Sequence, residues 1–252
     1  MLGFGFGHTI SSALNSGRSL LFLGLIGRWF GSDAVGIVGF TLRVAEFLTP
    51  FRVVAARMIV PVLAPISDTA KLMNIGQRKA SELEILLTVP LVVCGAALYF
   101  FVAIPLLGID WKDTLSVLPW VLVSKMLIVP HAMVFSALNI KGRFGPTISL
   151  TMLGLVLETT MLWLLGSAYG LEGIGAATIA FWLPALMIHW VAVQQLSFGW
   201  NRRAQLWAWA GVSVCLSLRF GPVFIVGSVS ILLMTWREVR DVVNEVIRTF
   251  SK

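Results

Sequence analysis

Long apolar runs separated by short polar linkers dominate this sequence. The chain has 252 residues, of which 58% are hydrophobic and only 12% are charged, whereas a soluble domain averages about 25% charged residues. A hydrocarbon layer about 30 Å thick needs roughly 20 apolar residues for each helical crossing. The pattern therefore predicts an all-α, polytopic membrane protein of about eight transmembrane helices, with no room for a separate soluble domain.

Eight runs are long enough to consider as crossings. They extend over residues 7–27, 35–66, 83–109, 114–140, 146–168, 173–198, 204–218 and 222–236. The first run has neither a preceding basic cluster nor a small-residue cleavage site, so we expect a retained helix rather than a signal peptide. The last two runs have about 15 residues each, which barely spans a bilayer. They form either two crossings or one re-entrant hairpin.

The basic residues of the linkers predict an orientation, because cytoplasmic loops carry an excess of Lys and Arg. One set of alternating linkers, with the C-terminal tail, holds Lys71, Arg78, Lys79, Lys141, Arg143, Arg202, Arg203, Arg237, Arg240, Arg248 and Lys252. The other set holds only Arg28, Lys112 and Arg219. We therefore expect the first set and both termini to be cytoplasmic, and the number of crossings to be even.

Several functional classes find no support in the residue pattern. The net charge is +7, but the basic residues are dispersed between apolar runs, so a nucleic-acid partner is not expected. The three histidines and two cysteines lack ligand spacing, which argues against a metal site. No phosphate-binding loop or catalytic Ser/His/Asp set is recognisable. The sequence thus predicts neither an enzyme nor a cofactor.

The scattered histidines and cysteines have ordinary structural interpretations. Cys94 and Cys215 lie inside apolar runs and are expected to be buried small hydrophobic residues. His131 follows Pro130, and His189 lies in the run that contains Pro184. We expect each histidine to be a packed or hydrogen-bonded helix residue rather than a proton relay.

Ionisable side chains inside the apolar runs are the strongest functional signal. Each costs at least about 2.5 to 3.5 kcal/mol at mid-membrane, so such groups usually face a bundle interior and find a partner there. They are Arg18, Arg43, Glu46, Arg52, Arg57, Lys125 and Glu158. Together they predict a cationic chamber between helices, with a few balancing carboxylates.

The second run places much of this charge on one helical face. Arg43, Glu46 and Arg57 fall within about 100° of one another, and Pro50 is expected to kink the helix. Arg43 and Glu46 are spaced to form a pair. Arg52 and Arg57 either line the chamber or extend toward the cytoplasmic headgroups.

For three of these basic residues, two interpretations remain open. Arg18, Arg43 and Lys125 either face a lumen or form salt bridges that only hold the bundle together. Glu158 either neutralises Lys125 or binds a coupling cation.

A series of short motifs resembles a known transporter family. The pieces are residues 27–31 (GRWFG), 35–43 (VGIVGFTLR), 60–65 (VPVLAP), 108–111 (GIDW), 137–143 (ALNIKGR) and 169–177 (YGLEGIGAA). In this order and spacing they resemble the C-terminal half of a lipopolysaccharide or O-antigen type polysaccharide flippase, of the multidrug/oligosaccharidyl-lipid/polysaccharide transporter superfamily. The resemblance covers most of the chain.

The resemblance implies one six-helix lobe with two extra C-terminal helices. Residues 1–200 would form the transporter lobe, and residues 201–252 would form two short transmembrane helices and a basic, amphipathic cytoplasmic tail. Such transporters have a second, pseudo-symmetric lobe, and no internal duplication is present in this sequence. The expected partner is therefore a missing N-terminal lobe or a second copy of the chain.

The resemblance also implies a function in polysaccharide export. It implies translocation of an undecaprenyl-diphosphate-linked oligosaccharide across a bacterial inner membrane by alternating access. Arg18, Arg43, Lys125 and Arg57 would bind the anionic headgroup, while Glu46 and Glu158 would balance charge. Alternatives are half of a drug or small-solute exporter of the same superfamily, a membrane enzyme, or a structural subunit of polysaccharide assembly.

Overall fold

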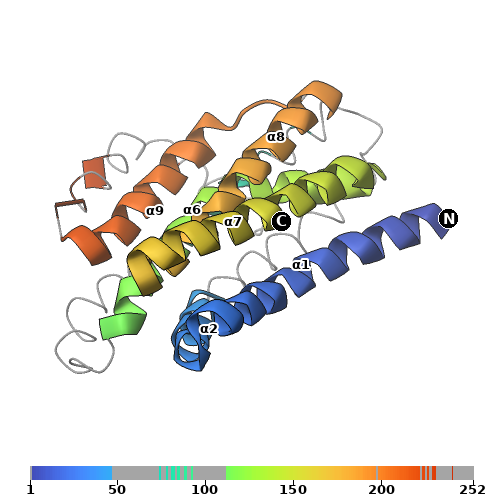
Figure 1. Cartoon of the computed structure of the whole chain (residues 1–252). Coiled ribbons are helices and arrows are strands. Elements are labelled where there is room, and N and C mark those ends of the chain that lie inside the picture. Colours follow the sequence, from blue (N-terminus) through green and yellow to red (C-terminus); the bar gives the residue numbers. More distant parts are fainter. Residues whose placement is uncertain are drawn as a thin grey trace.

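The computed structural model describes most of the chain apart from one long internal segment and the C-terminal tail. The described residues are 2–46, 112–196 and 198–221, with single positions at 74, 78, 81–82, 84–85, 88–89, 92, 223–224, 226, 229–230 and 240. All secondary structure in these residues is helical, without a strand (Figure 1). The expectation of an all-α fold is confirmed for this part of the chain.

Two consecutive helices open the chain. Helix α1 covers Leu2–Phe30 and helix α2 covers Ser32–Glu46. They are joined at Gly31, whose φ of 90° lies in the left-handed region that glycine adopts without strain. A buried face of α2, formed by Ala34, Val38, Thr41 and Ala45, recurs with helical spacing. The two helices pack against each other and against α6 and α7.

Helix α6 is the central element of the described bundle. It extends over Lys112–Ile140 and contains Pro119 and Pro130 without a break. It contacts α2, α7, α8 and α9 as well as the short 3₁₀ helix η3, which covers Thr178–Phe181. Charged residues on α6 are therefore well placed to meet side chains from several helices.

Helix α7 turns back on itself near its C-terminal end. It extends over Phe144–Ala177, but Gly170 has non-helical angles, with φ 59° and ψ −134°. A Cβ atom at Gly173 would lie against the carbonyl group of Leu165, so the chain after the turn packs directly on the turn before it. Helix η3 and helix α8, Trp182–Leu196, then run beside α7 (Figure 1).

Helix α9 closes the described bundle. It extends over Arg202–Phe220, and the Asn201 side chain accepts a hydrogen bond from the backbone N–H of Ala204, which caps its first turn. Its 19 residues correspond to about 28 Å, close to the thickness of a bilayer core. Gly211 lets α9 approach α6, where Met126 fills the space that a side chain would need.

The outer surface of the bundle is unusually apolar. Two helical stretches, Lys112–His131 and Phe144–Leu196, are long and apolar enough to cross a membrane, and the second includes the turn at Gly170. Only 22% of the apolar window in the second stretch is buried. Large side chains such as Trp163, Trp190 and Leu20 are more than half exposed. An apolar outer face of this kind fits lipid better than water.

The predicted runs agree with the described helices, with shifted ends. The run 114–140 corresponds to α6, and the runs 146–168 and 173–198 meet at the Gly170 turn. The run 204–218 is a continuous helix, α9. Most of the second, third and eighth runs lies outside the described residues, so the number of crossings stays a prediction. The amphipathic tail also lies outside them, except for Arg240.

Candidate functional site

A cavity of about 380 Å³ lies between the helices of the bundle. Its lining comes from α1, α2, α6, α7, η3 and the described positions 84 and 88. The ionisable members of the lining are Arg18, Glu84, Lys125 and Glu158. The rest is apolar or hydroxyl-bearing, including Phe22, Leu42, Thr88, Val121, Ser124, Ile128, Phe135, Thr178 and Phe181.

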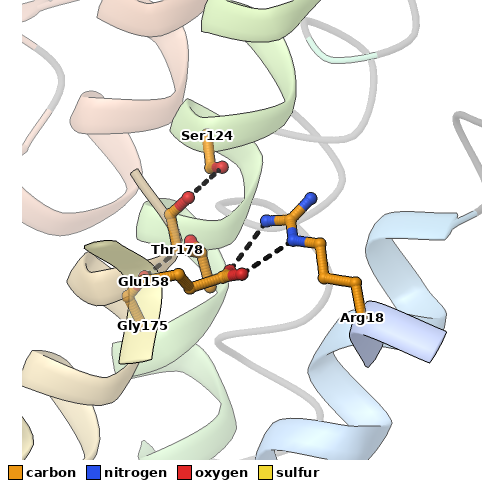
Figure 2. A network of polar contacts seen from close by, with 5 residues as sticks. All are labelled: Arg18, Ser124, Glu158, Gly175 and Thr178. Atoms are coloured by element: carbon orange, nitrogen blue, oxygen red, sulfur yellow. Dashed lines mark hydrogen bonds and ion pairs between the residues drawn. The ribbon is translucent and has the colours of Figure 1, made fainter. Parts of the chain in front are cut away.

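The centre of the site is an ion pair between α1 and α7. Nε of Arg18 donates to Oε2 of Glu158, and Nη2 of Arg18 donates to Oε1, both at 2.7 Å (Figure 2). The side chain of Glu158 is 4% exposed and that of Arg18 is 23% exposed. Two parallel charge-assisted bonds of this length form the strong, bidentate geometry of an arginine and a carboxylate. The pair is therefore a specific and nearly desolvated contact.

An aromatic ring also contacts the side chain of Arg18. The guanidinium carbon lies 3.7 Å from the centroid of the Phe181 ring, a cation–π arrangement. Phe181 reaches this position because Gly154 on α7 has no side chain; a Cβ atom there would lie 2.5 Å from the ring. Gly154 precedes Glu158 by about one helical turn. Gly154, which leaves room for the Phe181 ring, and the carboxylate of Glu158 therefore lie on the same face of α7.

Hydroxyl groups hold α6 against the start of η3 beside the ion pair. Ser124 Oγ donates to the carbonyl oxygen of Thr178 at 2.8 Å, and Thr178 Oγ1 donates to the carbonyl oxygen of Gly175 at 2.7 Å (Figure 2). Gly175 itself lies against Val117 of α6. These bonds satisfy backbone carbonyls at the irregular end of α7, and they fix the wall of the cavity.

The charges of the lining are more balanced than the sequence predicted. Lys125 on α6 adds a second basic group to Arg18. Glu84, which is fully buried, adds a second carboxylate to Glu158. We did not single out Glu84 from the sequence, although its position at the start of an apolar run was a usable signal. The chamber thus carries two basic and two acidic side chains in its described lining, and it is not strongly cationic.

Two predicted site residues on α2 do not contribute to this lining. Arg43 and Glu46 are exposed. Arg43 is two residues from both Thr41 and Ala45, so it points about 200° away from the buried face of α2. No ion pair joins Arg43 to Glu46 in the described helix. The expectation that Arg43 lines the chamber beside Arg18 is not met, and Arg57 lies outside the described residues.

The partner of Glu158 also differs from the two that the sequence left open. We expected this carboxylate to neutralise Lys125 or to bind a cation, and it pairs with Arg18 instead. The two residues are 140 positions apart, so no spacing rule could join them. They meet because α1 packs on α7. In the described part of the chain, no group of three or more His, Cys, Asp or Glu residues could hold a metal ion.

Comparison with known proteins identifies no relative. No protein-family model, no curated protein and no solved structure matches the chain. The sequence motifs and the cavity are therefore the features that bear on function.

Proposed function

We propose that the chain is one half of a flippase for lipid-linked oligosaccharides in a bacterial inner membrane. The observation that carries the proposal is the meeting of Arg18, Lys125 and Glu158 at one cavity inside an apolar helical bundle. Ionisable groups at such a place are expensive and are usually retained for a substrate or ion path. The motif resemblance supplies the cargo, an undecaprenyl-diphosphate-linked glycan.

The bidentate contact of Arg18 supports an anionic headgroup as ligand. The guanidinium fork that holds a carboxylate with two parallel bonds holds a phosphate oxygen pair with the same geometry. In the proposed mechanism the diphosphate replaces Glu158 on Arg18, and Lys125 supplies the second positive charge. The lipid tail of the cargo stays in the bilayer, and rocking against a second lobe alternates the opening. That second lobe is a separate N-terminal lobe or a second copy of the chain.

A second candidate function follows from the buried carboxylates. Glu84 and Glu158 balance the basic groups of the cavity, and a balanced chamber also suits a neutral or cationic small solute. Half of a drug or small-solute exporter of the same superfamily is therefore the alternative. The two candidates differ in their need for the positive charge at Lys125, because only an anionic cargo requires it.

Complementation tests the proposal directly. The chain is expressed in a flippase-deficient bacterium, with and without its neighbouring reading frame, and surface polysaccharide is measured. We expect rescue with the neighbour if the second lobe is a separate chain, and rescue alone if two copies assemble. Membrane insertion without rescue under either condition would contradict the flippase proposal.

Cavity variants then test the role of the charges. Arg18→Lys keeps the charge and removes the fork, and Lys125→Gln removes the charge. Loss of one charge-assisted contact of about 1.5 to 3 kcal/mol lowers binding by about ten-fold or more, so we expect a comparable loss of surface polysaccharide at limiting expression. Arg28→Gln is the matched control, because Arg28 is exposed at the end of α1, outside the cavity lining. Equal surface polysaccharide with Lys125→Gln and with the control would contradict the role of Lys125 in holding the anionic headgroup.

A further inference from the structure

Two histidines from different helices meet in the bundle interior. His131 of α6 and His189 of α8 are 2% and 1% exposed, and their Nδ1 atoms lie 3.1 Å apart. The two rings are perpendicular, with centroids 5.1 Å apart. This distance is that of a hydrogen bond. The contact joins two helices whose histidines are 58 residues apart in the sequence.

The contact depends on the number of protons that the pair carries. A hydrogen bond between two Nδ1 atoms requires one protonated nitrogen and one bare nitrogen. The contact therefore tolerates either two neutral rings or one imidazolium that donates to a neutral ring. When both rings are protonated, two N–H groups point at each other and two positive charges lie side by side. The contact cannot persist in that state.

An indole ring covers the pair. Trp200 stacks on His189, with centroids 4.3 Å apart and an interplanar angle of 13°. Its ring also lies edge-on to His131 at 6.3 Å. The segment that carries Trp200 is held in place because the Asn74 side chain accepts a hydrogen bond from the backbone N–H of Gly199. The pair is thus enclosed by α6, α8 and this segment.

Among the described residues, no acidic side chain forms a hydrogen bond or an ion pair with either ring. Helix α8 has no charged residue, and His189 Nε2 is buried with no hydrogen-bond partner in the described part of the chain. The charged groups of the surrounding described elements are engaged elsewhere or lie at other sites. They are Arg18, Glu84, Lys125 and Glu158 at the cavity, Glu172 with Arg219, Arg143 with Gln195, Glu82 with Asn201, Arg78 and Lys141 in the linkers, Lys112 and Asp113 at the start of α6, and Arg202 and Arg203 at the start of α9.

A metal ion is a weaker explanation for the same geometry. Two imidazole nitrogens at this distance could supply two ligands of a metal ion, but structural and catalytic metal sites need at least three protein ligands. No third His, Cys, Asp or Glu residue completes such a group in the part of the chain that the structure describes. The ligand that fits the pair is a proton.

The pair lies close to the wall of the charged cavity. His131 occupies the same stripe of α6 as the cavity-lining residues Ser124, Ile128 and Phe135, within about 60° on the helix. Beyond the pair, α6 and α8 are held together by an apolar cluster that includes Val134, Ala137, Ile188 and Ala192. A change at the pair therefore acts on the helix that forms one side of the cavity.

We propose that His131 and His189 form a proton-binding site that joins α6 to α8 while one Nδ1 is bare, and that separates the two helices once both rings are protonated. The site makes the packing of the cavity wall sensitive to pH. It does not depend on the nature of the cargo.

The pH dependence of stability tests this site in the purified full-length chain in nanodiscs. Below about pH 6.5 the unfolded chain binds a proton on each free histidine. The closed pair binds fewer protons than the unfolded chain, so stability falls as the pH falls. We expect the melting temperature to fall by about 2 to 4 °C more per pH unit below pH 6.5 in the unmodified protein than in His131→Gln. The glutamine amide can accept a bond from protonated His189, so the contact persists.

Two further variants set the controls. His189→Gln should flatten the pH dependence like His131→Gln, and the double variant should be no flatter than the flatter single variant. His8→Gln changes the third histidine of the sequence and should leave the pH dependence unchanged. The same slope in the unmodified protein and in both single variants would overturn the proposal, as would loss of the slope in His8→Gln.

Nitrogen NMR gives a test that needs no substitution. Because the chain has only three histidines, ¹⁵N-histidine labelling produces few signals. We expect one protonated Nδ1 coupled to one bare Nδ1 near pH 7.5, and loss of this coupling on acidification together with shifts of α6 and α8 resonances. Two histidines that titrate independently, with no change in the helices, would exclude the proposed site.

Discussion

At the scale of single residues, the Arg18–Glu158 pair illustrates how charge is accommodated in an apolar bundle. Its bonds are as short as those of the Arg219–Glu172 pair, 2.7 Å in both cases. The surroundings differ, because the side chains of Arg219 and Glu172 are 42% and 38% exposed. A buried charge that loses its partner cannot recover the loss from solvent, so the two pairs should respond very differently to the same substitution.

The first prediction concerns the removal of one partner. Arg18→Gln leaves the Glu158 carboxylate buried without its cation, and we expect destabilisation of about 3 kcal/mol or more. The double variant Arg18→Gln/Glu158→Gln places two neutral amides in contact and should recover part of this loss. Thermal unfolding in nanodiscs measures both effects. A double variant that is as unstable as the sum of the single variants would contradict the pairing.

The exposed pair provides the matched control. Arg219→Gln should lower the free energy of unfolding by about 0.5 kcal/mol, which is a typical contribution of an exposed ion pair. The comparison keeps the residue types and the bond length, but the Arg219–Glu172 pair is exposed and has one bond, from Nη2, instead of two. Equal losses for Arg18→Gln and Arg219→Gln would mean that the bilayer interior does not isolate the first pair.

At the scale of elements, the turn-back at the C-terminal end of α7 depends on glycine. Gly170 provides the positive φ of the turn, and Gly173 lets the two arms touch. A Cβ atom at Gly173 would clash with the backbone carbonyl group of Leu165. Because the obstacle is backbone rather than a mobile side chain, it cannot move aside cheaply.

The second prediction follows from that contact. Gly173→Ala should destabilise the bundle by more than about 2 kcal/mol, within the range for overpacked cores. Gly145→Ala, in the same helix with no atom within 4 Å of the added Cβ, should be neutral or slightly stabilising. Melting temperatures of the two variants decide between these outcomes. Similar values for both would show that the turn-back opens easily.

At the scale of the whole molecule, the more hydrophobic of the two candidate membrane stretches is the less buried one. The stretch Phe144–Leu196 is the more hydrophobic of the two candidate membrane stretches, yet only 22% of its apolar window is buried. In a water-soluble bundle such side chains would form the core. The arrangement suggests a protein associated with a membrane.

The third prediction tests the orientation that the basic linkers imply. Tyr169 and Arg202 are both exposed and lie on either side of one predicted crossing. In a background with Cys94→Ala and Cys215→Ala, Tyr169→Cys should react with a membrane-impermeant maleimide added from outside the inner membrane. Arg202→Cys should react only in inverted vesicles or after lysis. Reaction of both from the same side would contradict the positive-inside assignment.

The sequence by itself determined the class of fold and the position of most described helices. Hydropathy needs no tertiary information, because a run of about 20 apolar residues must satisfy its backbone within one helix wherever it lies in lipid. The turn at Gly170 also needs no tertiary information, because a positive φ is a local backbone requirement that glycine meets. The burial of Cys215 was also predicted, since it lies in an apolar run of α9.

Only the tertiary structure decided which charges meet. Helical spacing orders residues within a helix, but Arg18 and Glu158 belong to helices far apart in the sequence, as do His131 and His189. Arg43 lies on the wrong side of α2 for the cavity, because the rotation of a helix is set by what packs against it. Partners across helices depend on packing that a linear pattern does not encode, and for that reason the sequence predicted a charged chamber but not its pairs.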